Sequence, residues 1–428
     1  MNIENSKFFS RLDKIAQKLN SNKFLAAYSQ GASVTMGIIL VGAVFTILAV
    51  ILQTLGVIES YDATYNLLVL PNTMTMGLLT LIISFTLGYF YAEKLKLKPL
   101  QNGIASMVCF LIVAAPATTV TTADGGSFTG LSTENMGASG MFAAMIVGFI
   151  VVQINRICVE KNIVIKMPDA VPPALAAGFT SALPLFFSVT LWYLVSLACN
   201  AFAGMDFPTL IQTILRYPLA GLNSWVGVII LAILQSLFWF IGVHGSGILT
   251  PITFPLIMMD VNTNQELLAA GQPLIWTPMM ALMMKSILGG DGNIWALEIL
   301  GVWKAKSEKV KSISKAAFIP GMFSIGEPAI FGYPVMYNIT LLPGYMLATV
   351  VPVILGIIFG NMGLLTPYIT FIFAIVPFNL HQFFCTGFSI TNLIFDICLI
   401  PVCMVCYYPF FKAYDDQCLK EEQGEAVA

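Results

Sequence analysis

One carboxylate in this sequence is surrounded by residues suited to lipid. Glu327 lies in the segment GEPAIFG at 326–332, between apolar stretches. A charged side chain at bilayer depth costs about 2.5–3.5 kcal/mol on insertion scales, so we expect it to have a function. Gly326 and Pro328 predict a broken helix, which is tolerated at that depth only against protein or a cavity. There a carboxylate can bind ligand hydroxyl groups or act as a base toward one. The alternative is a buried glutamate paired with a lysine such as Lys285.

A second polar group occurs at the end of an apolar stretch. The segment WFIGVHGSG at 239–247 places His244 between glycines. Gly245 allows a backbone to approach a ligand closely, and a histidine can donate to or accept from a hydroxyl near neutral pH. Trp239 offers a flat face on which a ring could stack, as does Trp276. The alternative is a histidine that caps a helix beside an interfacial tryptophan.

Two further segments contain polar residues in an apolar context. PFNLHQ at 377–382 places Asn379 and His381 where they could join the same site, or could face water at a helix end. GGDG at 289–292 lacks the lysine and hydroxyl of a nucleotide-binding loop, which predicts a plain turn. The chain holds no paired-histidine metal motif, so we expect no metal and no cofactor.

The composition indicates a polytopic membrane protein of all-α class. Charged residues make up 10% of the 428 residues and hydrophobic residues 57%, whereas soluble proteins carry about 25% charge. The net charge of -2 gives no reason to expect nucleic-acid binding. Most of the eight cysteines lie in apolar runs and are interpreted as packing residues.

About ten transmembrane helices of roughly 20 residues fit the apolar runs, together with shorter re-entrant hairpins. The predicted spans and shorter apolar pieces cover about 29–55, 73–92, 100–115, 138–155, 170–199, 224–243, 248–259, 274–288, 341–360, 364–380 and 388–411. The second half contains more glycine, proline and asparagine near lone polar groups. Because transporters build binding sites from broken helices, this half is the predicted site of binding.

Lysine and arginine positions predict the orientation of the spans in the membrane. Basic residues follow the runs that end near 92 and 155 and are dense at 304–315, whereas 56–72 and 116–137 contain none. The positive-inside rule therefore puts both termini and the 304–315 loop in the cytoplasm, and 116–137 outside as a loop. Residues 1–24 predict an amphipathic helix on the cytoplasmic face. The polar segment 413–428 predicts a disordered cytoplasmic tail.

Two ordered segments and the loop between them resemble the membrane-spanning IIC component of bacterial sugar phosphotransferase systems. These are FWFIGVHGSG at 238–247, KAKSEKVKSISK at 304–315 and GMFSIGEPAIFGYPVMYN at 321–338. The similarity is greatest to the lactose/cellobiose/diacetylchitobiose group and covers nearly the whole length.

The resemblance implies a homodimer in which 25–220 forms the interface and scaffold, and 221–412 binds and carries the sugar. It also places the family's sugar-binding histidine at His244, its glutamate at Glu327 and its tryptophan at Trp239. The family commonly has threonine or asparagine before the glutamate, whereas this chain has Gly326. Asn379 and His381 stand where some members have a tryptophan, which predicts a change in specificity.

The resemblance also implies a mechanism. A disaccharide of the cellobiose or diacetylchitobiose type binds near Glu327 and His244, is moved across the membrane by alternating access, and is phosphorylated by a separate cytoplasmic IIB protein with IIA upstream. Glu327 would be the catalytic residue, and the phosphate donor would lie on another chain. Two alternatives remain open at this point: an ion- or proton-coupled transporter of a neutral solute, with Glu327 in a proton relay, and a sugar sensor without net transport.

Overall fold

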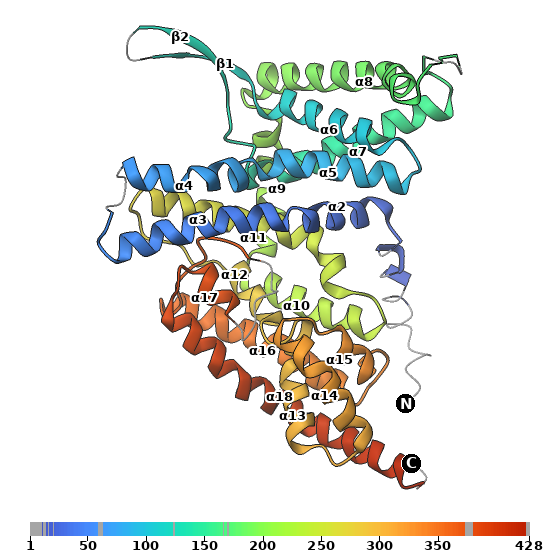
Figure 1. Cartoon of the computed structure of the whole chain (residues 1–428), viewed down its shortest axis with the longest axis vertical. Coiled ribbons are helices and arrows are strands. Elements are labelled where there is room, and N and C mark those ends of the chain that lie inside the picture. Colours follow the sequence, from blue (N-terminus) through green and yellow to red (C-terminus); the bar gives the residue numbers. More distant parts are fainter. Residues whose placement is uncertain are drawn as a thin grey trace. The chain divides into compact units, whose positions relative to one another are not determined.

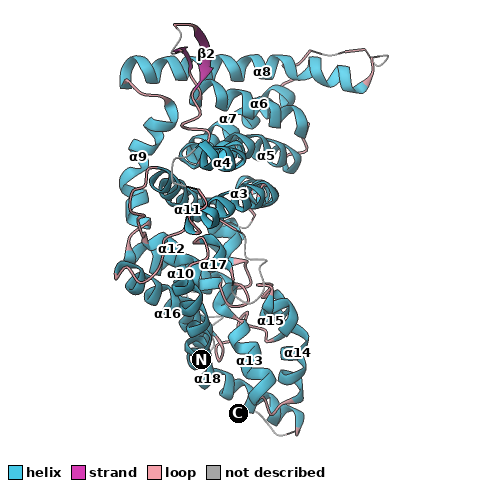
Figure 2. Ribbon diagram, turned by 60° about the vertical axis from the view of Figure 1, so that its left-hand side comes forward, coloured by secondary structure: helices cyan, strands magenta, loops and turns pink. Residues whose placement is uncertain are grey.

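The computed structural model describes residues 11, 14–15, 17–19, 21–58, 63–122, 125–165, 167–168, 171–372 and 380–424. These residues are mostly helical, as predicted (Figures 1 and 2). The all-α prediction needs one correction, because a two-stranded antiparallel hairpin occupies the predicted 116–137 loop. It pairs Ala117 with Leu131 and Thr121 with Ser127. Asn379 and most of the predicted 1–24 helix lie outside the described residues.

The chain divides into two compact units. The N-terminal unit comprises Ser21–Thr46 and Ala63–Pro218, and the C-terminal unit comprises Met1–Asn20, Ile47–Asp62 and Leu219–Ala428. The elements of the N-terminal unit are α2 (Lys23–Val34), α3 (Met36–Thr54), α4 (Ala63–Thr75), η2 (Met76–Leu78), α5 (Leu79–Lys94), α6 (Pro99–Ala114), β1 (Ala117–Thr121), β2 (Ser127–Leu131), η3 (Ala138–Gly140), α7 (Met141–Glu160), α8 (Pro173–Ala198), the π-helical turn η4 (Cys199–Ala203) and α9 (Phe207–Leu222). Helices α3 and α9 continue past the boundaries of this unit.

Small residues set the helix packing of the N-terminal unit. Helices α5, α6 and α7 contact one another, and α8 contacts α6 and α7. A Cβ atom at Gly88 would lie 2.7 Å from the carbonyl oxygen of Asn102, so α5 and α6 pack with their backbones close together. Close approach at glycine is a common way to join helices in lipid. Phe110 and Trp192 are buried in the core of this unit.

The C-terminal unit has shorter and more interrupted elements. They are α10 (Trp225–Phe240), α11 (Gly245–Ala269), α12 (Pro278–Leu282), η5 (Met283–Ser286), η6 (Asp291–Asn293), α13 (Trp295–Lys304), α14 (Glu308–Met322), α15 (Glu327–Gly332), α16 (Leu342–Asn361), α17 (His381–Cys385) and α18 (Ile390–Glu422). Helix α16 packs against both α10 and α18, and α13 packs against α14 and α18.

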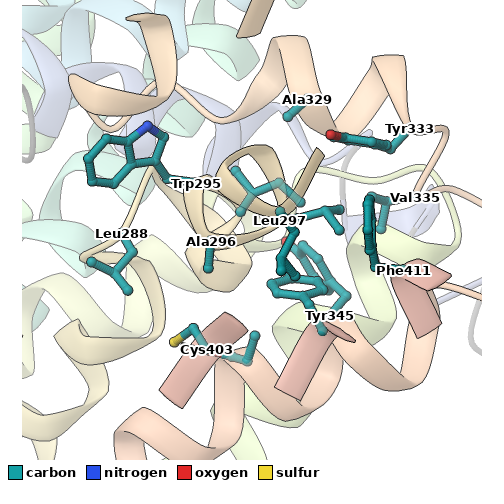
Figure 3. Packing of buried hydrophobic residues seen from close by; sticks show 14 of the residues in the cluster. Leu288, Trp295, Ala296, Leu297, Ala329, Tyr333, Val335, Tyr345, Cys403 and Phe411 are labelled. Atoms are coloured by element: carbon teal, nitrogen blue, oxygen red, sulfur yellow. Dashed lines mark hydrogen bonds between the residues drawn. The ribbon is translucent and has the colours of Figure 1, made fainter. Parts of the chain in front are cut away.

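A buried apolar cluster joins these elements. Figure 3 shows Trp295 and Leu297 of α13 together with Tyr345 of α16 and Phe411 of α18. The cluster lies next to the glycine turn at 289–292, because a Cβ atom at Gly292 would lie 2.1 Å from the Tyr345 ring. Helix α16 therefore packs on this turn through Tyr345. Tyr407 of α18 also donates a hydrogen bond of 2.6 Å to the Gly292 carbonyl.

Several helices in the described residues can cross a membrane. Six are long and apolar enough, and a seventh span results if α9 and α10, which are bent by 73° at their junction, count as one. They are Met36–Gln53, Ala63–Lys94, Ala138–Glu160, Gly178–Ala203, Leu342–Asn361 and Ile390–Glu422. The chain is therefore a multi-pass membrane protein.

Two predictions about the end of the chain are wrong. The described part of the predicted 364–380 span, residues 364–372, is not helical. The segment after Lys412 is not a disordered tail over its described residues, since α18 continues to Glu422. The buried Asp415 carboxylate accepts hydrogen bonds from the backbone N–H groups of Lys306 and Ser307, at 2.8 and 3.0 Å. A tertiary contact at the start of α14 thus orders a segment that is polar in sequence.

Candidate functional site

His244 is the N-cap of α11, and its two ring nitrogens have different partners. Nδ1 accepts a hydrogen bond of 2.9 Å from the backbone N–H of Gly247, which caps the helix. The proton of a neutral ring then belongs on Nε2, and this nitrogen lies 3.7 Å from Oε1 of Glu327. The two interpretations that the sequence allowed, a helix cap and a polar group of the site, are therefore compatible.

Glu327 begins α15 after a tight turn. Helix α14 ends at Met322, Ser324 adopts a left-handed φ of 62°, and Gly326 precedes the new helix. This is the predicted break in the backbone. The Glu327 side chain is 46% exposed and that of His244 is 50% exposed. Both groups therefore remain accessible to a ligand.

The turn before Glu327 packs directly on the glycine turn that precedes η6. A Cβ atom at Gly326 would lie 2.5 Å from the carbonyl oxygen of Gly289, and one at Gly290 would lie 2.8 Å from that of Ser324. Gly290 also has a φ of 84°, which other residues rarely adopt. A side chain at Gly290 or Gly326 would collide with the opposite turn, so glycine at both positions allows the two backbones to pack this closely.

A buried polar network underlies His244. Asp291 accepts hydrogen bonds of 2.7 Å from Nε1 of Trp239 and from Oγ of Ser246. Lys285 donates to the same Ser246 oxygen at 2.9 Å and lies 3.6 Å from Asp291. The side chains of Lys285 and Asp291 are only 11% and 10% exposed. The lysine suggested as a partner for Glu327 therefore pairs with Asp291 instead.

This network fixes the tryptophan beside the histidine. The ring centroids of Trp239 and His244 are 4.6 Å apart with an interplanar angle of 45°. Because Asp291 holds the Trp239 N–H, the indole has a single orientation relative to the imidazole. A buried, fully hydrogen-bonded network of this kind keeps its members rigid.

These groups line a cavity of about 190 Å³. The lining residues are Trp239, His244, Ser246, Ser286, Gly290, Asp291, Ser324, Gly326, Glu327 and Ile330. Typical small-molecule pockets measure roughly 300–1,000 Å³. A cavity of this size, with polar groups on two sides and an aromatic ring, can hold one polar ring of a larger ligand.

The structure separates the predicted site residues into two groups. Trp239, His244, Gly326 and Glu327 line the cavity, and Gly245 lies beside them, packed against α10 at the carbonyl of Gln235. His381 does not line it.

His381 is instead buried in α17. Its Nε2 contacts the carbonyl oxygen of Ile372, and Cys385 Sγ is 3.7 Å from the same nitrogen. Trp276 also lies outside the lining and packs on Gly360 and Tyr368.

Sequence reasoning missed the participation of Lys285, Asp291 and Ser246. A signal was present, because Lys285 and Asp291 are the two charged residues between Glu266 and Glu298. Lone charges in such a segment usually pair with each other. Asp291 belongs to the segment 289–292 that is predicted as a plain turn, yet its carboxylate accepts hydrogen bonds from Trp239 and Ser246.

The comparisons with known proteins agree with this fold. Residues 29–349 match the family described as "Phosphotransferase system, EIIC". The chain is 29% identical to the lichenan permease IIC component of Bacillus subtilis, over 99% of this chain and 96% of that protein. It is also 29% identical to the cellobiose-specific EIIC component of Geobacillus stearothermophilus, over 97% of this chain and 95% of that protein.

A relative named as an EIICB component and one solved structure extend the comparison. The lactose-specific EIICB component of Streptococcus mutans is 28% identical over 95% of this chain and 72% of its own length. The crystal structure of the transporter ChbC, the IIC component from the N,N'-diacetylchitobiose-specific phosphotransferase system, has a TM-score of 0.86 and 26% identity. That similarity covers 96% of this chain and 98% of the solved one. This chain belongs to the phosphotransferase system EIIC family, the membrane-spanning sugar permease components of those systems.

Proposed function

We propose that this permease carries a disaccharide of the cellobiose or diacetylchitobiose type and presents it for phosphorylation by a IIB protein. The observation that carries the proposal is the placement of His244 and Glu327, 3.7 Å apart at one cavity beside the Trp239 ring. A carboxylate and an imidazole can bind neighbouring hydroxyl groups, while an indole face can stack on a sugar ring. The relatives whose names include lactose, cellobiose and diacetylchitobiose support the substrate class.

Glu327 is the proposed catalytic residue. Its carboxylate accepts a hydrogen bond from the sugar 6-hydroxyl and takes its proton as the oxygen attacks phosphorus. The new O–P bond forms while the bond between phosphorus and the IIB side chain breaks, so the phosphoryl group passes from protein to sugar. His244 donates from Nε2 to a second hydroxyl. The charge of the sugar phosphate then prevents its return through the membrane.

The proposed architecture assigns separate tasks to the two halves of the chain. Residues 25–220 form the scaffold and homodimer interface, and 221–412 bind the sugar and move across the membrane as a rigid body. Residues 1–24 lie at the cytoplasmic face, and 413–428 remain cytoplasmic. The boundary between the compact units after Pro218 supports this division, whereas Ile47–Asp62 of the proposed scaffold falls in the C-terminal unit. About ten spans with re-entrant hairpins and cytoplasmic termini complete the proposal.

The IIB partner and the basic segment 304–315 belong to the same proposal. This segment was predicted as a loop, but its residues from Glu308 onward are part of helix α14. The EIICB names of several relatives support a IIB partner, which would itself be phosphorylated by IIA. Lys304, Lys306, Lys309 and Lys311 of this segment form part of the proposed IIB docking face. Basic residues at this position also suit contact with anionic lipid.

The test is transport by proteoliposomes that contain the purified chain. We expect cellobiose or diacetylchitobiose to appear inside as a sugar phosphate only when phosphorylated IIB is supplied on the side of the segment 304–315. A binding screen with these sugars, lactose and monosaccharides identifies the substrate. Uptake of unmodified sugar that is driven by a proton gradient without IIB would contradict the proposal and favour an ion-coupled transporter.

A further inference from the structure

Two adjoining cavities lie between α6, α7 and α8 of the N-terminal unit. Their volumes are about 290 and 380 Å³. Both are lined by Gln101, Asn155 and Ser181, so they form one continuous groove. None of these residues belongs to the sugar cavity. The groove therefore needs an explanation of its own.

One end of the groove is largely apolar. Its cavity is lined by Gln101, Asn102, Ile104, Ala105, Val151, Asn155, Gly178, Ser181, Pro184, Leu185 and Ser188. Helices α7 and α8 both contain candidate membrane spans, and α8 exposes Phe187 and Leu194 close by in sequence. This end of the groove thus suits a hydrocarbon chain.

The other end is basic. Its cavity is lined by Lys96, Leu97, Lys98, Pro99, Gln101, Asn155, Val159, Thr180 and Ser181. Lys98 is the N-cap of the 16-residue helix α6, and no side chain caps that helix. An uncapped helix N-terminus beside two ammonium groups is suited to bind an anion such as phosphate.

The backbone holds Lys96 in an unfavourable conformation. Lys96 follows the end of α5 with a φ of 60°, at a position where helices usually have glycine. A non-glycine residue in this region is strained. Glycine would relieve the strain, whereas lysine adds a charge at the mouth of the groove.

One unpartnered polar atom lies in the lining of the apolar end, next to Gln101, which lines both cavities. Asn102 is 1% exposed, and its Nδ2 donates to the carbonyl of Lys98 at 2.8 Å. Its Oδ1 has no hydrogen-bond partner among the described residues. Buried polar atoms are nearly always paired, so this acceptor calls for a donor. A hydroxyl group of a ligand would supply it.

We propose that this groove binds an anionic diacyl phospholipid with a hydroxylated headgroup, of which phosphatidylglycerol is the test case. The phosphate lies between Lys96, Lys98 and the start of α6. A headgroup hydroxyl donates to Asn102, and one acyl chain follows the apolar end along α7 and α8. A basic pocket between transmembrane helices is a recognised type of anionic-lipid site.

The experiment is native mass spectrometry of the purified full-length chain in detergent, titrated with phosphatidylglycerol or with phosphatidylcholine of the same acyl chains. We expect phosphatidylglycerol to bind more tightly. The double variant Lys96→Gln/Lys98→Gln should weaken that binding by roughly fivefold per lysine. The matched control Lys94→Gln/Lys161→Gln removes the same charge at the same end of the helices, outside the lining, and should leave binding unchanged.

A third variant distinguishes a lipid from a free anion and from a second copy of the chain. Ala105→Phe fills the apolar end and should abolish phosphatidylglycerol binding, with an unchanged helical signal in circular dichroism. Equal weakening by both lysine pairs would overturn the proposal. Retained binding in Ala105→Phe, with inorganic phosphate competing, would show a phosphate site without lipid. Loss of a dimer in Ala105→Phe, without bound lipid in the parent, would show that another copy fills the groove.

Discussion

Glu327 and His244 meet at the cavity because each is held by backbone contacts from its own side. The hydrogen bond of 2.9 Å from the Gly247 N–H to Nδ1 holds the His244 imidazole. The turn at Gly326 places the Glu327 carboxylate at the start of α15. The two side chains contact each other at 3.7 Å, but each also has backbone contacts of its own. One can therefore be replaced while the other stays in place, which makes single substitutions informative.

Replacing Glu327 with glutamine tests its proposed role as a base. The amide keeps the size and a hydrogen-bond acceptor but cannot take a proton. We expect IIB-dependent sugar phosphorylation to fall by at least roughly 100-fold, while the protein stays folded. Product formation in membrane vesicles measures the effect. The control Glu134→Gln removes an exposed carboxylate outside the proposed IIB docking face and should behave as wild type. Normal product formation by Glu327→Gln would remove the residue from catalysis.

The Lys285–Asp291 pair gives a second prediction at this scale. Asp291→Ala leaves a buried ammonium group without its partner and releases Trp239. We expect a loss of about 3–5 kcal/mol in the free energy of unfolding, because an uncompensated buried charge is costly. Lys285→Met combined with Asp291→Ala should recover much of that stability but not sugar affinity. Thermal unfolding and sugar binding, measured on the same samples, separate the two effects. Equal stability of the single and double variants would contradict the pairing.

At the scale of elements, the site depends on two turns rather than on two helices. Asn293 secures the glycine turn, since its Nδ2 donates to the carbonyls of Met284 and Ala348, at 2.9 and 2.7 Å. The turn before Glu327 then packs on that support through Gly289 and Gly326. This contact gives a physical reason for a glycine at position 326.

Gly326→Ala tests the contact between the turns. The new Cβ atom would meet the Gly289 carbonyl at 2.5 Å and Ile294 at 2.8 Å. We expect a loss of about 1–3 kcal/mol in the free energy of unfolding from overpacking, together with weaker sugar binding. Gly37→Ala is the control, because its Cβ atom would meet nothing within 4 Å in α3. A stable Gly326→Ala variant with normal binding would refute the close packing.

The end of α18 makes a similar prediction. Asp415→Ala leaves the backbone N–H groups of Lys306 and Ser307 without their acceptor. We expect a loss of about 1–3 kcal/mol in the free energy of unfolding and faster proteolysis of the connection 305–307 between α13 and α14. Asp416→Ala is the neighbouring control, since its side chain makes no hydrogen bond within the described part of the chain. Matching effects of the two substitutions would mean that the cap contributes nothing specific.

At the scale of the whole molecule, the proposed homodimer gives a direct prediction. Helix α8 of the N-terminal unit exposes large apolar side chains, among them Phe186 at 62% and Leu194 at 56%. Either lipid or a second copy can cover them. We expect light scattering of the detergent-solubilised chain to give twice the mass of one chain. A monomer that retains IIB-dependent phosphorylation would contradict the homodimer as a requirement for function.

The sequence alone was sufficient for the class, the family and the core of the candidate site. Apolar runs identify spans because a bilayer admits few alternatives to a helix. Lone polar residues beside helix breaks, such as Glu327 and His244, are visible for the same reason, since lipid makes them costly. Local signals also predicted the turn at 289–292 and the break at Gly326.

Tertiary contacts decided the rest, because pairing between distant residues leaves little trace in local sequence. Lys285 faces Asp291 rather than Glu327, and His381 lies against Ile372 and Cys385 rather than in the cavity. Residues 413–422 are helical, and Asp415 among them satisfies backbone groups more than a hundred positions away. Hydropathy reports how each segment partitions between water and lipid. Only the folded chain determines which polar groups meet, since that depends on how the helices and turns pack.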